Sequence, residues 1–233
     1  MFHMAEFVVK RNMGHKPFCD WDNAKKDRVY SKLASIINTR VRHGFAVAVP
    51  KKPFDDYVFP EFRQYAENHF VWAVKTMIGF IAEWRSKYAI TSPMQYVFES
   101  GSLGEDQLRE VWKDSLLHKN SDAKYGIVPN GVMFQDKRYF KPLQAADILA
   151  WQAQNHMRRT VLIGRDPNDE TLVHHGYRVL RDKRPMATLF FSREQMKYAF
   201  DGAKDYHRHH GLWPWQPEAK ANLRVLETAP GKI

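Results

Sequence analysis

The sequence predicts an α/β fold, on three observations. Short apolar runs that are typical of β-strands alternate with longer segments in which apolar residues recur at helical spacing. The order of strand and helix repeats through most of residues 1–160, as expected for a sheet flanked by helices. With 233 residues, 44% of them hydrophobic, the chain is long and apolar enough to bury a sizeable core.

The expected elements follow one another along this first part. They are a helix over 24–43, a strand over 45–49, a helix over 60–88, a strand over 94–98, a helix over 105–118, a strand over 132–134 and a helix over 141–157. Asp22 or Asn23 is suited to cap the first helix. Pro50 and Pro53 are expected to stop the first strand.

After Arg159, the apolar residues recur at a less regular helical or strand spacing. Residues 171–180 are compatible with either helix or strand, and 192–205 read as a helix with Ser192 as its cap. We therefore expect a core over 1–160 and a C-terminal extension over 161–233 that is mostly helical or irregular.

The helix over 141–157 is central to the prediction. Pro142 suits its first turn. Apolar side chains then recur at helical spacing and predict a buried face: Leu143, Ala146, Ala150, Ala153 and Met157. Gln144 and Asp147 are three residues apart and neighbours on the helix, where a carboxylate among apolar side chains is costly unless a cation, metal ion or donor meets it. The alternative is an Asp147 at a solvent-facing edge or bonded to a loop.

A second acid, Glu99, directly follows the strand over 94–98 and precedes Ser-Gly-Ser-Leu-Gly. Ligand sites in open α/β sheets form where loops leave the carboxyl ends of strands, and glycines there leave room for a ligand. The alternative is a surface glutamate that begins a loop. If Glu99 and Asp147 converge, they form the carboxylate arrangement that holds Mg²⁺ or Mn²⁺ for phosphodiester hydrolysis.

The charge of the chain favours an anionic partner. It has 36 basic and 26 acidic residues, which gives a net charge of +10. This charge favours nucleic acid, either DNA or RNA, over a membrane surface as the partner. The alternative is that the charge serves only solubility. Asp136, Lys137, Arg138 and Lys141 precede or begin the helix over 141–157, whose N-terminus attracts anions. We expect Lys137, Arg138 and Lys141 to contact phosphates.

The single cysteine, Cys19, forms no intramolecular disulfide and suits a reducing cytoplasm. No apolar run approaches the roughly 20 residues that span a bilayer, so we expect a soluble cytoplasmic protein with no membrane partner. The sequence contains no P-loop, dinucleotide fingerprint, Cys-x-x-Cys or Ser/His/Asp signature, which argues against several common classes of enzyme.

Two histidine-containing segments are weaker candidates for metal binding. His3 and Glu6 are three apart and would share one helical face, although such pairs are common on ordinary helices. The C-terminal segment contains His207, His209 and His210 and then two tryptophans, and a solvated basic segment is its simpler interpretation. Exposed tryptophans there would also suit an adaptor for another protein.

Three segments resemble the family catalogued as domain of unknown function 3800, within the ribonuclease H-like superfamily. They are Phe2-His-Met-Ala-Glu6, the strand Tyr96-Val-Phe-Glu99-Ser-Gly, and Asp136-Lys-Arg-Tyr-Phe-Lys-Pro-Leu-Gln144-Ala-Ala-Asp147. The last is the most specific, because this family characteristically places Gln-x-x-Asp at the start of its final core helix. The resemblance covers residues 1–160.

The resemblance implies a ribonuclease H-like mixed sheet flanked by helices, with an acidic, metal-dependent site that acts on nucleic acid. It implies that Glu99 and Asp147 are metal ligands and catalytic residues, that Gln144 orients a ligand or the scissile phosphate, and that the other lining residues are Asp136, His3 and Glu6. His3 and Glu6 are further candidate metal ligands.

The sequence departs from the family at its beginning. The family opens with a strand that ends in Asp-Glu-Ser-Gly and with two further strands, and this sequence begins after the place where they would lie. We expect a truncated member rather than a degenerate one, lacking the first metal-binding aspartate. The absent strands would leave a sheet edge that another protein, including a second copy of the chain, could cover.

These observations lead to two hypotheses from different classes. The first is a metal-dependent nuclease that hydrolyses phosphodiester bonds, inactive if the absent strands are essential. The alternative is a non-catalytic nucleic-acid-binding or accessory protein that keeps the fold and the charge.

Overall fold

The computed structural model describes a large part of the chain, and all structural statements below concern that part. The described residues are 7, 18–102, 104–117, 125–128, 131–162, 164–166, 169, 173, 175–181 and 184–210. His3, Glu6 and the tryptophans of the C-terminal segment lie outside them, as do the side chains of His207 and His210.

The described elements confirm the predicted α/β class. In order they are α2 (Asn23–Arg40), β1 (Gly44–Ala48), α3 (Lys51–Tyr57), α4 (Pro60–Ala66), α5 (His69–Lys87), β2 (Tyr96–Glu99), α6 (Glu105–Leu117), β3 (Val132–Gln135), α8 (Lys141–Leu162), α9 (His175–Arg181), β4 (Met186–Phe190) and α10 (Arg193–His210). Within these elements, no helix combines the length and apolarity needed to cross a bilayer.

The described strands form two parallel pairs. Strand β1 pairs with β4, from Gly44 opposite Met186 to Ala48 opposite Phe190. Strand β2 pairs with β3, from Tyr96 opposite Val132 to Glu99 opposite Gln135. Because both pairs are parallel, the two strands of each pair end at the same edge.

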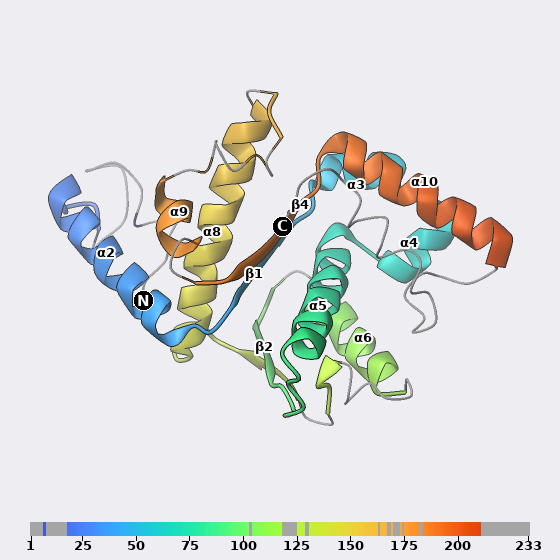
Figure 1. The fold of residues 1–233 in the computed structure, drawn as a ribbon, viewed down its shortest axis with the longest axis horizontal. Helices are drawn as coiled ribbons and strands as arrows, with labels where there is room; N and C mark the ends of the chain where they lie inside the picture. Colours follow the sequence, from blue (N-terminus) through green and yellow to red (C-terminus); the bar gives the residue numbers. More distant parts are fainter. Residues whose placement is uncertain are drawn as a thin grey trace.

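Helices cover the β1–β4 pair from two sides (Figure 1). Strand β1 contacts α8 on one side and α5 on the other. On the α8 side, Ala46 and Phe190 pack with Ala153 of α8 and Tyr177 of α9. Helix α2 lies farther out on that side and contacts α9. The core therefore lies in layers, with the β1–β4 pair between helices.

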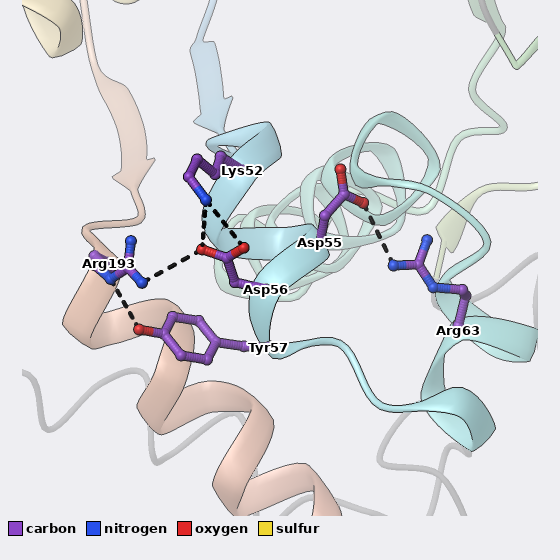
Figure 2. Close-up of polar contacts among 6 residues, drawn as sticks. All are labelled: Lys52, Asp55, Asp56, Tyr57, Arg63 and Arg193. Atoms are coloured by element: carbon purple, nitrogen blue, oxygen red, sulfur yellow. Dashed lines mark hydrogen bonds and ion pairs between the residues drawn. The ribbon is translucent and has the colours of Figure 1, made fainter.

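An aromatic cluster holds α10 against α3 and α4. Its fully or nearly fully buried side chains are Phe54, Phe62, Phe191, Met196 and Phe200. Figure 2 shows the polar contacts at its rim, where Asp56 lies 3.3 Å from both Lys52 and Arg193. Exposed ion pairs of this kind contribute little stability, so the buried rings make the larger contribution.

The helix predicted over 60–88 is wrong in one respect, because the chain breaks between α4 and α5. Glu67 adopts a positive φ of 58°. Asn68 then caps α5, its Oδ1 accepting hydrogen bonds from the backbone nitrogens of Phe70 at 3.0 Å and Val71 at 2.9 Å. Asparagine side chains compete with helical backbone bonds in this way. Apolar residues continue through the break, and this continuity suggested one helix.

Helix α3 forms where the sequence predicted only the end of a strand. Pro50 occupies its N-cap position, and Pro53 is its third residue. The first turn of a helix needs no backbone donors, so proline is tolerated there. The two prolines are therefore compatible with a short helix that directly follows β1.

Strand β4 comes from the segment that the sequence predicted to be mostly helical or irregular. Its register with β1 brings residues 186–190 into the middle of the molecule. The sequence of residues 171–180 was compatible with either helix or strand. In the structure, helix α9 begins at His175. The boundary at residue 160 stays a prediction, but the residues after it complete the β1–β4 pair.

The predicted buried face of the helix over 141–157 is partly wrong. Ala153 is buried, as expected, but Ala146 and Ala150 are exposed. The buried residues of α8 are Ile148, Gln152, Ala153, His156 and Thr160. Alanine side chains have little apolar surface, so leaving Ala146 and Ala150 exposed costs little.

Candidate functional site

The carboxyl edge of the β2–β3 pair brings three of the predicted segments together. Glu99 is the last residue of β2 and lies opposite Gln135, the last residue of β3. The backbone nitrogen of Ser100 donates to the carbonyl of Gln135 at 2.9 Å, which extends the pairing by one residue. Residues 136–140, which we call the edge turn, lead from this point into α8.

Hydrogen bonds fix the edge turn. The carbonyl of Asp136 accepts from the backbone nitrogens of Tyr139 and Phe140, each at 3.0 Å. The carboxylate of Asp136 accepts from the backbone nitrogen of Arg138 at 2.8 Å. Aspartate commonly stabilises turns through such a bond to its own backbone two residues on. The turn therefore has a defined shape before α8 begins at Lys141.

Lys137 joins the edge turn to the end of β2. Its Nζ lies 2.9 Å from Oε1 of Glu99, and its side chain is 12% exposed, against 44% for that of Glu99. An ammonium group that is largely removed from water is stabilised by an opposite charge. The sequence predicted that Lys137 contacts phosphate, and in the described structure its charge faces this carboxylate.

Gln144 joins α8 to the same turn. Its Nε2 donates a hydrogen bond to the carbonyl of Lys137 at 2.9 Å. Gln144 thus supports the backbone of the residue whose side chain meets Glu99. Its predicted role in orienting a ligand stays a prediction, and its described bond gives it a positioning role in the turn.

Asp147 follows Gln144 by one helical turn and is half-buried. Residues three apart on a helix are neighbours, so Asp147 lies on the Gln144 side of α8. Helix α8 also contacts β2, the strand that ends at Glu99. Both predicted acids therefore belong to elements that contact each other, and their convergence stays a prediction.

Asp136 and Arg138 form a second ion pair at the edge. The Nε of Arg138 donates to a carboxylate oxygen of Asp136 at 2.6 Å. This hydrogen bond, followed by the one from the backbone nitrogen of Arg138, lowers the pKa of Asp136. The predicted lining residue Asp136 is thus an ionised acceptor that shapes the turn.

Lys141 and Tyr139 are exposed at the outer side of the edge turn. The Nζ of Lys141 lies 3.5 Å from the carbonyl of Arg138, and the side chain of Tyr139 is 80% exposed. The sequence reasoning did not select Tyr139. Its position between Arg138 and Lys141, two predicted phosphate contacts, is the signal that could have identified it.

The predicted metal ligands are only partly described. His3 and Glu6 lie outside the described residues. Elsewhere in the described ranges, no group of three or more His, Cys, Asp or Glu side chains is placed to hold an ion. Glu99 and Asp147 stay the predicted ligands.

A separate pocket of about 640 Å³ lies between α6, β3 and the break before α5. Its lining includes Trp112, Arg109 and Val132 but not Glu99, Gln144 or Asp147. Its charged lining residues carry both signs, which indicates no single class of ligand. The carboxyl edge of the β2–β3 pair therefore remains the better candidate site.

Comparisons with family models, with curated proteins and with solved structures found no match to this chain.

Proposed function

We propose that this chain is a metal-dependent nuclease of the ribonuclease H-like kind, which hydrolyses phosphodiester bonds at the carboxyl edge of the β2–β3 pair. One observation carries most weight in its support. Glu99 ends β2 opposite the last residue of β3, and Gln144 of α8 donates to the turn that follows β3. The net charge of +10 adds support, because it favours a polyanionic substrate.

In this proposal Glu99 and Asp147 hold Mg²⁺ or Mn²⁺. Both ions prefer oxygen ligands, and Mg²⁺ is often bound by only one or two carboxylates, with water and substrate phosphates as its other ligands. Two acids are therefore compatible with such an ion. A bound ion would activate water and stabilise the leaving oxygen of the phosphodiester.

The remaining residues bind and position the substrate. Arg138 and Lys141 are exposed at the edge turn, where they can meet phosphates. Lys137, beside Glu99, adds positive charge close to the site of reaction. Gln144 keeps the turn in place through the carbonyl of Lys137.

The ribonuclease H-like fold is part of the proposal. The described strands form two parallel pairs, whereas this superfamily is expected to have one mixed sheet. Support for the assignment comes from the order of elements: β2 ends at Glu99 and pairs with β3, and α8, which contains Gln144 and Asp147, follows β3.

A cleavage assay on the full chain tests the proposal. Labelled DNA and RNA, single-stranded and duplex, are incubated with Mg²⁺, with Mn²⁺ and with a chelator. We expect cleavage that needs the metal, is abolished by Asp147→Asn and by Glu99→Gln, and is unchanged by Glu61→Gln. Glu61 is an exposed acid on α4 and serves as the matched control. Undiminished cleavage by the Asp147→Asn protein refutes the assignment.

The second candidate is a nucleic-acid-binding protein without catalysis. The ion pair between Lys137 and Glu99 favours it, because an ammonium group already meets the carboxylate that a metal ion would need. Binding through phosphates weakens steeply with salt and needs no divalent ion. Salt-dependent binding without metal-dependent cleavage by any of the substrates would select this candidate.

A further inference from the structure

Tyr139 has the highest exposed fraction among the exposed large hydrophobic side chains of the described residues, at 80%. Single exposed aromatic side chains are ordinary, so exposure alone implies no function. What distinguishes this ring from the other exposed rings is the turn that supports it and the place of that turn beside the proposed site.

The ring is presented by a fixed support. The backbone nitrogen of Tyr139 donates a hydrogen bond to the carbonyl of Asp136. The backbone nitrogen of Arg138 donates a second one to the carboxylate of Asp136. A ring on an ordered turn loses little conformational entropy when it binds a ligand. Tyr139 is therefore suited to stack without a rearrangement of the backbone.

One cationic side chain lies over the ring, and a second is close to it in sequence. The guanidinium carbon of Arg138 lies 5.6 Å from the ring centroid of Tyr139. Lys141 is exposed two residues further on, and Asp136 is the acid that pairs with Arg138. An aromatic face beside cations matches a nucleotide, whose base stacks on the ring while its phosphates meet the cations.

Tyr139 belongs to the same turn as Lys137, the residue that contacts the proposed site. Lys137, two residues before Tyr139, reaches Glu99 with its ammonium group, and Gln144 bonds to its carbonyl. A nucleotide that stacks on Tyr139 therefore meets the turn whose Lys137 also contacts Glu99.

We propose that Tyr139 is a stacking platform for an unpaired base, and that the ligand of this edge is single-stranded nucleic acid. This inference depends on the proposed action on nucleic acid and adds its substrate class. In a duplex the faces of a base are covered by its neighbours in the stack, so a surface ring reaches them only where the strand is unpaired. Every base offers a π-face, so stacking selects unpaired strands without selecting their sequence.

Fluorescence anisotropy with a labelled single strand and the matching duplex tests this inference. The variants are Tyr139→Ala, Tyr139→Phe and, as matched control, Tyr198→Ala, which removes a tyrosine that is 62% exposed on α10. We expect Tyr139→Ala to weaken single-strand binding about 5- to 150-fold, the effect of about 1–3 kcal/mol of stacking per base. Tyr139→Phe and Tyr198→Ala should bind like the unchanged protein, and duplex affinity should not respond to Tyr139→Ala.

The outcomes separate this inference from the proposed function. Equal single-strand binding by Tyr139→Ala, or tighter binding of the duplex than of the single strand, overturns the stacking platform and leaves the nuclease proposal standing. No binding of any nucleic acid at low salt overturns both. Because Tyr139 is on the surface, its variants are expected to fold, and circular dichroism checks this.

Discussion

Nζ of Lys137 lies 2.9 Å from Oε1 of Glu99, and this contact joins the turn after β3 to the end of β2. The two side chains differ in burial, with 12% of Lys137 exposed and 44% of Glu99. Removing the charge of Glu99 should therefore change the free energy of unfolding by a different amount from removing the charge of Lys137. A carboxylate that keeps contact with water tolerates the loss of its partner better than a largely buried ammonium does.

The first prediction concerns this asymmetry. Glu99→Gln should lower the free energy of unfolding by about 1–2 kcal/mol, between the values typical of surface and of buried pairs. Lys137→Met should cost less, because the methionine keeps the apolar stem and Glu99 stays half-exposed. Urea unfolding of both variants measures the difference. Equal losses, or a larger loss for Lys137→Met, contradict the assignment of burial to Lys137.

The second prediction concerns the break between α4 and α5. Asn68→Ala removes the acceptor that meets the backbone nitrogens of Phe70 and Val71, so it should lower the free energy of unfolding by about 1 kcal/mol. Asn23→Ala is the control, since Asn23 is exposed on α2 and Asp22 provides the cap there. Thermal unfolding compares the two. If one helix ran through this region, Asn68→Ala would raise stability instead.

The third prediction separates backbone strain from steric contact at glycine. Gly126 has a φ of +67°, and a Cβ there would lie 2.7 Å from Nη1 of Arg85. Gly164 has a φ of +66°, with nothing within 4 Å of its would-be Cβ. Gly164→Ala should cost about 1–2 kcal/mol for the left-handed backbone alone. Gly126→Ala should cost at least about 1 kcal/mol more, because overpacking adds to the strain. Similar losses in urea unfolding would mean that Arg85 does not pack there.

The fourth prediction concerns alkaline pH. Burial raises the pKa of Tyr30, Tyr96 and Tyr177 from 10.0 to about 12. Above pH 10 the unfolded chain loses phenolic protons that the folded chain keeps, so stability is complete below pH 10 and is lost as the pH rises toward 12. Urea unfolding at a series of pH values, followed with tyrosinate absorbance, measures this loss. Tyr177→Phe should make it smaller, and an unchanged slope in that variant counts against the burial of Tyr177.

Local patterns predicted a good part of the fold. The strands that became β1, β2 and β3 were short apolar runs, and α6 and α8 followed from helical spacing. What the patterns did not predict depends on distant contacts. Strand β4 gains its place by pairing with β1 more than a hundred residues away, and no local signal reports such a partner.

In the candidate site, too, local patterns predicted some features, and other features depend on contacts between distant residues. The sequence predicted that Glu99 and Asp147 converge, and this stays a prediction. The resemblance added Asp136 and Gln144 as lining residues, and the contacts of Lys137 join the segments of Glu99, Asp136 and Gln144. The sequence did not indicate that the side chain of Lys137 turns inward toward Glu99 while Tyr139 turns outward. The hydrogen bonds of the edge turn and the contact of Lys137 with Glu99 form only when the segments fold together, so no local pattern reports them.

The central claim is that Glu99 and Asp147 hold one divalent ion, and calorimetric titration of Mn²⁺ into the full chain tests it most directly. We predict saturable binding by the unchanged protein and by Glu61→Gln, and loss of that binding in both Glu99→Gln and Asp147→Asn. Mn²⁺ binding that persists unchanged in both variants, or no binding by the unchanged protein, contradicts the claim.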